Sequence, residues 1–216
     1  MRLDPELLRV EFIGATVRHA PRDLPRDEIA MFFSTVSDRY GFDRLELLPE
    51  GGASMSGEAG AELVLRGDQT TSCTVTGLGY REGRERVGDA LSEALELFGG
   101  EEVSIEDLTL VATWDLEGAG AAKRLLADGL LSSSGSELLE EGDASVGIRV
   151  WRRLGSGTLE CSIEPMHAEP SRLYVRLVYA EHEPVTEVGT ILERADEVRE
   201  FLHGPLTEFV CERAPS

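Results

Sequence analysis

The order of its periodic segments is the feature that most constrains the fold of this chain of 216 residues. Each half reads as a strand, an amphipathic helix, three strands and a second helix. Strands carry apolar residues at every second position, whereas helices repeat them at intervals of three and four. Because the strands are grouped together and the helices stand apart from them, this order predicts antiparallel pairing and an α+β fold.

The first half contains six of these segments. Its strands are predicted at Val10–Val17, Phe42–Leu48, Glu62–Arg66 and Ser72–Leu78, separated by a flexible loop at Glu50–Gly60. The first helix is predicted to be capped by Asp23, to hold Pro25 in its first turn and to end at Gly41, because proline suits the first turn and glycine the end of a helix. The second helix is predicted at Arg84–Phe98, with its end at Gly99–Gly100.

The second half repeats the order without repeating the residues. Its strands are predicted at Leu108–Trp114, Ser145–Arg153, Thr158–Glu164 and Arg172–Ala180, and its helices at Ala119–Leu131 and Glu187–His203. Pro205 is predicted to break or kink the last helix. We therefore expect two related β-α-β-β-β-α units, residues 1–100 and 101–216, which can also share one continuous domain. Helices packed on one face would leave the other face of the sheet open.

Charge and cysteine content restrict the partners and the compartment. The chain has 41 Asp and Glu residues against 21 Lys and Arg, a net charge of -20, which repels nucleic acids and anionic membranes. Its first residues lack the apolar core of a signal peptide, and no apolar run reaches the roughly 20 residues of a membrane span. Three separated cysteines without disulfide or metal-ligand spacing indicate a reducing cytoplasm. Because 20 of the 21 basic residues are Arg, the composition also suggests a GC-rich bacterial genome.

Two motifs invite a functional interpretation. The segment Gly77–Gly83 lies between a strand and a helix, as a dinucleotide-binding loop would. Its GxGxxxG spacing is looser than the dinucleotide pattern, and the preceding strand alternates polar and apolar residues, which favours a glycine-rich turn.

Glutamates surround His167 and His182, but a strand of about 3.3 Å per residue would hold the two groups roughly 25–30 Å apart. We therefore predict no metal and no cofactor. Cys161 alternates with the apolar residues Leu159 and Ile163, so we place it in the core.

The last three predicted strands alternate most clearly, so each assigns its residues to two faces. The core face takes Val146, Ile148, Val150, Leu159, Cys161, Ile163, Leu173, Val175, Leu177 and Tyr179. The other face takes the candidate binding residues Arg149, Trp151, Arg153, Arg172, Tyr174 and Arg176. This face is either a solvated surface of cross-strand Arg–Glu pairs or a binding face, since Trp and Arg are enriched at binding hot spots.

Short motifs in the second half carry a family resemblance. Gly147-Ile148-Arg149-Val150 is similar to a Gly-apolar-Arg-aromatic strand, and Leu202-His203 is followed by Leu206 and Phe209. The chain thereby resembles a sporadically distributed family of uncharacterised bacterial proteins. That family has an aromatic residue seven positions after the histidine, whereas Phe209 is six positions after His203. The resemblance implies the layout of the fold and brings no catalytic residues.

These observations favour a non-catalytic binding or assembly protein that uses the open face of its C-terminal sheet. Its expected partner is a second copy of the chain, in a homo-oligomer, or another protein. The alternative is an enzyme or small-molecule-binding protein with a pocket between the sheet and the helices. The sequence assigns no catalytic residue to that alternative.

Overall fold

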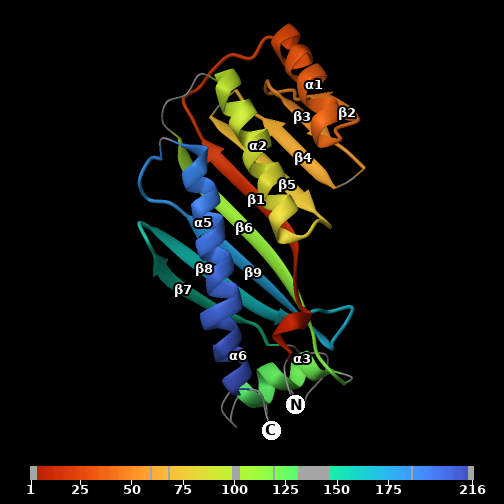
Figure 1. Cartoon of the computed structure of the whole chain (residues 1–216), viewed down its shortest axis with the longest axis vertical. Helices are drawn as coiled ribbons and strands as arrows, with labels where there is room; N and C mark the ends of the chain where they lie inside the picture. The colour runs from red at the N-terminus through yellow and green to blue at the C-terminus, as the bar shows by residue number, and fades with distance from the viewer. Residues whose placement is uncertain are drawn as a thin grey trace.

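In the computed structural model, the described residues form an antiparallel sheet of nine strands (Figure 1). The structure describes residues 4–58, 60–67, 69–98, 103–118, 120–130, 146–185 and 187–213. Across the sheet, the strand order is β2-β3-β4-β5-β1-β6-β9-β8-β7. The predicted α+β class, antiparallel pairing and helices on one face are confirmed. The predicted helix end at Gly99–Gly100, the boundary between residues 100 and 101, and Ser145 lie outside the described residues.

The strands and helices have the following bounds. The strands are β1 Leu8–Arg18, β2 Arg44–Leu47, β3 Ala53–Ser56, β4 Ala61–Leu65, β5 Thr70–Thr76, β6 Ser104–Asp115, β7 Ile148–Leu154, β8 Gly157–Pro165 and β9 Arg172–Ala180. The helices are α1 Arg26–Tyr40, α2 Tyr80–Phe98, α3 Ala121–Arg124, α5 Val188–Phe201 and α6 Thr207–Arg213. Wider π-helical turns follow α3 at Leu125–Leu130 and join α5 to α6 at Leu202–Leu206, and a short 3-10 turn at Pro5–Leu7 precedes β1.

The two halves share one topology. Outward from the centre, the first half runs β1-β5-β4-β3-β2 and the second runs β6-β9-β8-β7. In each half, the first strand therefore pairs with the last strand of that half, and the earlier strands follow outward. β1 and β6 pair with each other antiparallel, so they join the halves at the middle of the sheet. The first half has one more strand than predicted.

That extra strand corrects the prediction of a flexible loop at Glu50–Gly60, because Ala53–Ser56 forms β3. Ala53 and Met55 are fully buried and pair with Leu65 and Leu63 of β4. Two alternating apolar residues are too few to reveal a strand when glycines stand on both sides.

The ends of the helices show one further correction and two confirmed predictions. Asp23 does not cap α1, because Pro25 occupies the capping position and makes no side-chain hydrogen bond there. Gly41 ends α1 as predicted, in a left-handed conformation with φ of 73°. Pro205 interrupts the last helix as predicted, since it lies inside the π-helical turn that separates α5 from α6. In this turn the hydroxyl of Thr207 donates a hydrogen bond of 2.7 Å to the carbonyl of Leu202. This turn keeps the chain helical around a residue that lacks a backbone N–H.

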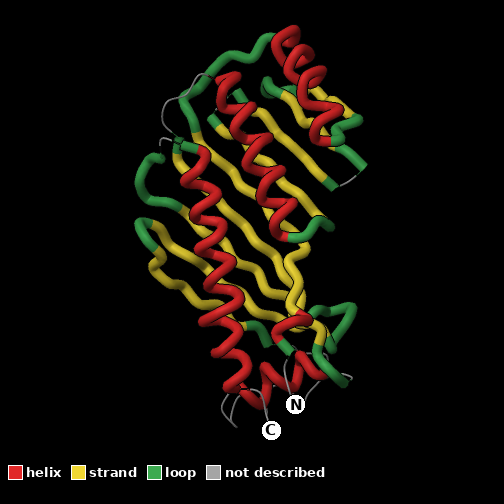
Figure 2. The backbone as a smooth tube through the Cα atoms, viewed as in Figure 1, coloured by secondary structure: helices red, strands yellow, loops and turns green. Residues whose placement is uncertain are grey.

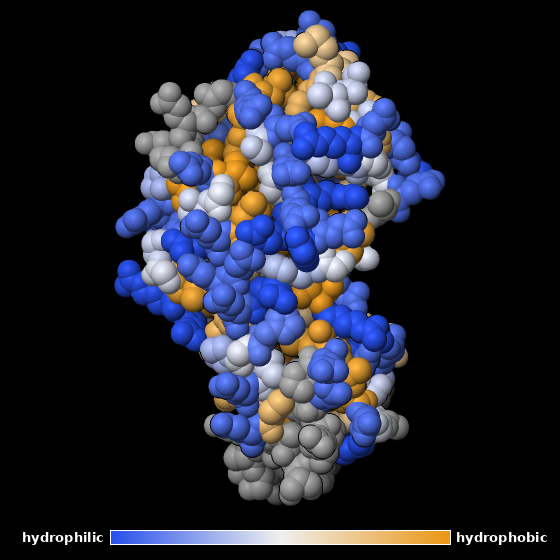
Figure 3. Space-filling model, in the orientation of Figure 1, coloured by the Kyte–Doolittle hydropathy of each residue, from blue (hydrophilic) through white to orange (hydrophobic). Residues whose placement is uncertain are grey.

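Helices α1, α2 and α5 lie on the same face of the sheet, and the core fills the space between these layers (Figure 2). Hydrophilic residues cover most of the outer surface of this face, with hydrophobic residues visible in the gaps between the helices (Figure 3). At the lower end of the molecule, α3 lies beside α6 (Figure 1). None of the described helices is both long and apolar enough to span a lipid bilayer.

Polar contacts and close packing hold α2 against α5. The carboxylate of Asp196 accepts hydrogen bonds from the Tyr80 hydroxyl at 2.8 Å and from the Arg84 guanidinium at 2.7 Å. One turn further along α2, Gly88 leaves room for the side chain of Leu192. The corresponding second helices of the two halves therefore pack as a pair over the centre of the sheet.

Gly157 gives a direct test of packing at the start of β8. A Cβ atom there would overlap the carbonyl oxygen of Ala180 and the ring of Tyr179, both parts of the core sheet. We expect Gly157→Ala to lower the free energy of unfolding by about 1–3 kcal/mol, measured by urea denaturation, because overpacking forces neighbours to shift. Gly189→Ala is the control, since its Cβ would meet open space in α5. Equal stability of the two variants would contradict this account.

Candidate functional site

All six predicted binding residues lie on the open face of the sheet, as their alternation predicts. Arg149, Trp151 and Arg153 project from β7, and Arg172, Tyr174 and Arg176 project from β9, two strands further in. The cross-strand pairing fixes their neighbours. Ser162 of β8 lies between Arg149 and Arg176, and Glu160 lies opposite Trp151.

The edge strand β7 has large apolar side chains that are exposed to solvent. Val150 was predicted to face the core, but its side chain is 44 % exposed. Because β7 is the outermost strand, the helix layer does not fully cover it, and on that side the guanidinium of Arg152 stacks 5.2 Å from the ring centre of Phe201 instead. On the open face Trp151 is 60 % exposed, so β7 presents large apolar side chains on both of its faces.

Glu160 ties the β7 side chains together. Its carboxylate accepts a hydrogen bond of 3.0 Å from the indole N–H of Trp151 and forms an ion pair of 3.3 Å with Arg149. The solvated Arg–Glu pairing expected from the sequence is therefore present at Arg149. Such an exposed pair contributes at most about 1 kcal/mol, and it leaves the Trp151 ring uncovered.

A hollow of about 690 Å³ lies in the middle of the open face, on strands from both halves of the chain. Its floor comes from β1, β5, β6 and β9. Register shifts between Val10 and Phe12 and between Thr16 and Val17 interrupt the β1–β6 pairing at both ends of this floor. Such irregularities bend a sheet and increase its twist, which accounts for a hollow at this place. The residues that line the hollow are Glu11, Phe12, Gly14, Ala15, Thr16, Thr74, Thr76, Asp107, Thr109, Val111, Thr113, Met166, Arg172, Tyr174 and Arg176.

The hollow brings together only three of the six predicted residues. Arg172, Tyr174 and Arg176 line its wall, whereas Arg149, Trp151 and Arg153 lie outside it on the edge strand. Sequence reasoning missed the threonine and apolar residues of the central strands. The polar positions of Thr70–Thr76 and Ser104–Asp115 alternate along one face and carry the signal, but only the strand pairing shows that these faces adjoin Arg172 and Arg176.

Most charges in the hollow are already matched within the protein. Arg172 pairs with Asp115 at 2.5 Å and with Glu169 at 3.3 Å. Glu11 accepts a hydrogen bond of 3.0 Å from the Thr113 hydroxyl. These contacts order the wall of the hollow rather than leave groups poised for proton transfer.

The carboxylate of Asp107 also has a partner within the protein, because it accepts a hydrogen bond of 2.5 Å from the Thr109 hydroxyl. Arg176 is the exception. Arg176 is exposed and makes no ion pair or hydrogen bond with another described residue. The described lining contains no histidine or cysteine, the side chains most often used as bases and nucleophiles near neutral pH.

The glycine-rich segment Gly77–Gly83 serves packing of the helix on the sheet. β5 ends at Thr76 and α2 begins at Tyr80, so residues 77–79 connect them and Gly83 lies in the first turn of α2. A Cβ atom at Gly83 would lie 2.7 Å from Cγ2 of Ile13, because α2 crosses β1 closely at this point. This close approach accounts for Gly83 without a bound nucleotide.

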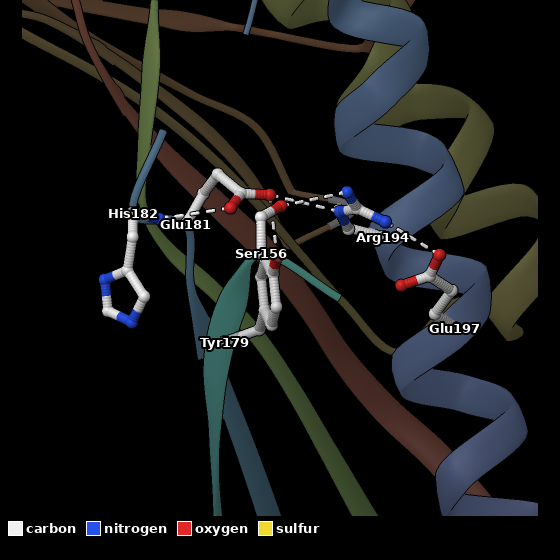
Figure 4. A network of polar contacts seen from close by, with 6 residues as sticks. All are labelled: Ser156, Tyr179, Glu181, His182, Arg194 and Glu197. Atoms are coloured by element: carbon white, nitrogen blue, oxygen red, sulfur yellow. Dashed lines mark hydrogen bonds and ion pairs between the residues drawn. The ribbon is translucent and has the colours of Figure 1, made fainter. Parts of the chain in front are cut away.

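The predicted His and Glu clusters lie at opposite ends of β9, and Glu181 has a different role from metal binding. Its buried carboxylate accepts hydrogen bonds from the Tyr179 hydroxyl at 2.7 Å, from Nε of Arg194 at 3.1 Å and from the backbone N–H of His182 at 3.1 Å (Figure 4). Arg194 belongs to α5, so the network fastens this helix to the end of β9. Within the described ranges, no group of three His, Cys, Asp or Glu residues could hold a metal ion.

The three cysteines are free thiols, and the core holds two of them. Burial raises the pKa of Cys161 and of Cys73 to about 12, which leaves both thiols protonated near neutral pH. The predicted core position of Cys161 is confirmed, since only 2 % of its surface is exposed.

No protein-family model and no curated protein matches the chain. The resemblance based on Gly147-Ile148-Arg149-Val150 and Leu202-His203 therefore stays a prediction.

The Glu181 network predicts a pH-dependent stability. Burial alone would raise the pKa of Glu181, but hydrogen bonds from Ser156, Tyr179, Arg194 and His182 outweigh it and lower the pKa from 4.5 to about 2. A lowered pKa stabilises the fold above the ordinary value, and this contribution disappears as the pH falls from 4.5 to about 2. We expect Glu181→Gln to lower the free energy of unfolding at pH 7 by about 3 kcal/mol, because it breaks a buried ion pair.

Urea denaturation of both proteins between pH 7 and pH 2 measures this difference. This difference in the free energy of unfolding should narrow as the pH falls from 4.5 to about 2, because Glu181 then takes up a proton in the unfolded parent protein while the fold still holds it ionised. Glu183→Gln serves as the control, because Glu183 is exposed two residues further along. A difference between the parent and Glu181→Gln that stays constant over the whole range would contradict the assignment.

Proposed function

We propose that the chain is a non-catalytic binding and assembly protein that works through the open face of its sheet. The observation that carries this proposal is the exposure of Trp151, at 60 %, on the outermost strand of the face that α1, α2 and α5 leave uncovered. Burying a large aromatic side chain stabilises a complex by roughly 2–3 kcal/mol. Covering this one residue would therefore contribute substantially to the free energy of association with a partner.

The charge distribution favours a second copy of the chain as this partner. β7 carries Arg149, Arg152 and Arg153 and no acidic residue, whereas the whole chain has a net charge of -20. Acidic side chains of a second copy are therefore attracted to β7, whereas the two copies as a whole repel each other. Complementary charges of this kind speed association and fix the orientation of two partners.

The contact is expected through the open face rather than through the backbone edge of β7. If two β7 strands paired antiparallel with Trp151 opposite itself, Arg149 of one copy would lie opposite Arg153 of the other. Like charges in direct cross-strand pairs are destabilising. A face contact avoids this repulsion and still covers Trp151.

The proposed compartment is the cytoplasm. Three free thiols, two of them buried, support this assignment, because reducing compartments keep thiols unpaired.

Trp151→Ala tests the assembly proposal. Sedimentation velocity over a series of protein concentrations should show the parent protein as a dimer or larger, and the variant should associate about 2 kcal/mol more weakly. Fluorescence gives a second measurement, because Trp114 is buried and Trp151 is exposed. The emission of Trp151 should shift to shorter wavelength as the parent protein associates.

Met31→Ala is the matched control, since Met31 is another exposed apolar side chain, on α1 of the helix face. It should associate like the parent protein. A parent protein that stays monomeric over the series, or equal association by Trp151→Ala, would show that the open face is not the assembly surface.

A further inference from the structure

We infer that the hollow on the open face binds a small organic monoanion with a flat apolar body. This inference rests on the proposed function in one respect only, namely that the open face is a binding face. It concerns the central strands, whereas the proposed assembly surface lies around Trp151 on β7. The two can therefore fail separately.

The anionic group is assigned by Arg176, the described cation of the hollow that has no ion-pair partner. Arg172 is held by Asp115 and Glu169, while Arg176 has no partner among the described residues. A guanidinium presents two parallel N–H donors that fit a carboxylate or sulfonate. An anion at Arg176 therefore forms charged hydrogen bonds that the protein itself does not supply.

The neighbours of Arg176 add to this position. Ser162 of β8 lies directly opposite Arg176, and Arg149 of β7 lies directly opposite Ser162. Neighbouring strands are about 4.8 Å apart, so the two arginines flank the serine at roughly 10 Å from each other. Ser162 is only 7 % exposed although its strand face is open. Arg149 is paired with Glu160 outside the hollow, so its charge adds only at a distance to the attraction of an anion toward Arg176.

The other residues that line the hollow indicate that the ligand has an apolar body. Phe12, Val111, Met166 and Tyr174 supply rings and apolar side chains to the lining. Val111 of β6 lies directly opposite Arg176. The volume of about 690 Å³ lies within the roughly 300–1,000 Å³ of pockets that take drug-sized ligands.

A single negative charge is assigned by the acidic residues that share the hollow. Glu11 and Asp107 lie on its other strands and would repel a second negative group. A polyanion such as a nucleic acid is therefore excluded, and a monoanion is favoured.

Two fluorescent probes with the same aromatic body separate charge from shape. 1-Anilinonaphthalene-8-sulfonate is a monoanion, and N-phenyl-1-naphthylamine is its neutral counterpart. We expect the parent protein to bind the sulfonate, and Arg176→Gln to bind it about tenfold more weakly, as expected for the loss of a charged hydrogen bond. Binding of the neutral probe should not change. Arg153→Gln is the matched control, because it removes the same charge from the same face outside the hollow, and it should bind both probes like the parent.

A second variant tests the position of the site. Val111→Trp fills the hollow and should abolish binding of both probes, with circular dichroism to confirm the fold. If Val111→Trp does not fold, Thr76→Trp serves as the filling variant instead, because Thr76 is an exposed lining residue at the end of β5.

The outcomes separate the anion assignment from the binding face. If the filled variants lose both probes while Arg176→Gln binds both like the parent, the hollow is a binding site and the anion assignment is wrong. If the parent does not bind the sulfonate, or the filled variant binds it equally well, the inference about the hollow is overturned. Sedimentation of Trp151→Ala reports on the assembly surface independently of both results.

Discussion

The antiparallel pairing of β1 with β6 is the interaction on which the rest of the structure depends. These two strands are the longest of the sheet and join its halves along their whole length. The pairing brings Thr109 and Thr113 beside residues of β1 that are about 100 positions earlier in the chain. Its two register shifts, one at each end of the floor of the hollow, bend the sheet there. Without this seam neither half would contain a complete hollow, because β1 and β5 supply one side and β6 and β9 the other.

The sheet and the helices are fastened by a small number of polar contacts, one of them centred on the buried carboxylate of Glu181. Glu181 joins the end of β9 to Arg194 of α5, and Asp196 joins α5 to Tyr80 and Arg84 of α2. Apolar packing alone allows neighbouring arrangements of similar energy, whereas a buried carboxylate must keep its donors. These contacts thus fix how the two helices lie over the sheet.

Local periodicity was enough to predict much of the fold, including β8, β9, α1 and the open face that bears Trp151 and Arg176. It failed where the deciding interaction joins distant parts of the chain. Ala53 and Met55 are a strand because β4 lies beside them, and Val150 is exposed because none of the described strands lies beyond β7. The hollow depends on the β1–β6 seam, and the role of Glu181 depends on a helix that begins seven residues later. None of these relations is visible in a window of neighbouring residues.

The position of β1 has a consequence for how the chain folds as it is synthesised. Its partner on one side, β5, belongs to the same half, but its partner on the other side, β6, emerges from the ribosome only after α2 is complete. Until then β1 is an unprotected edge of eleven residues, able to pair with any other strand that reaches it. Contacts of such long sequence separation also slow folding, since the loop must close before the strands stabilise each other. The first half is therefore most exposed to mispairing during the synthesis of the segment between Thr76 and Asp115, and a partner that shields this edge at that stage would raise the yield of folded protein.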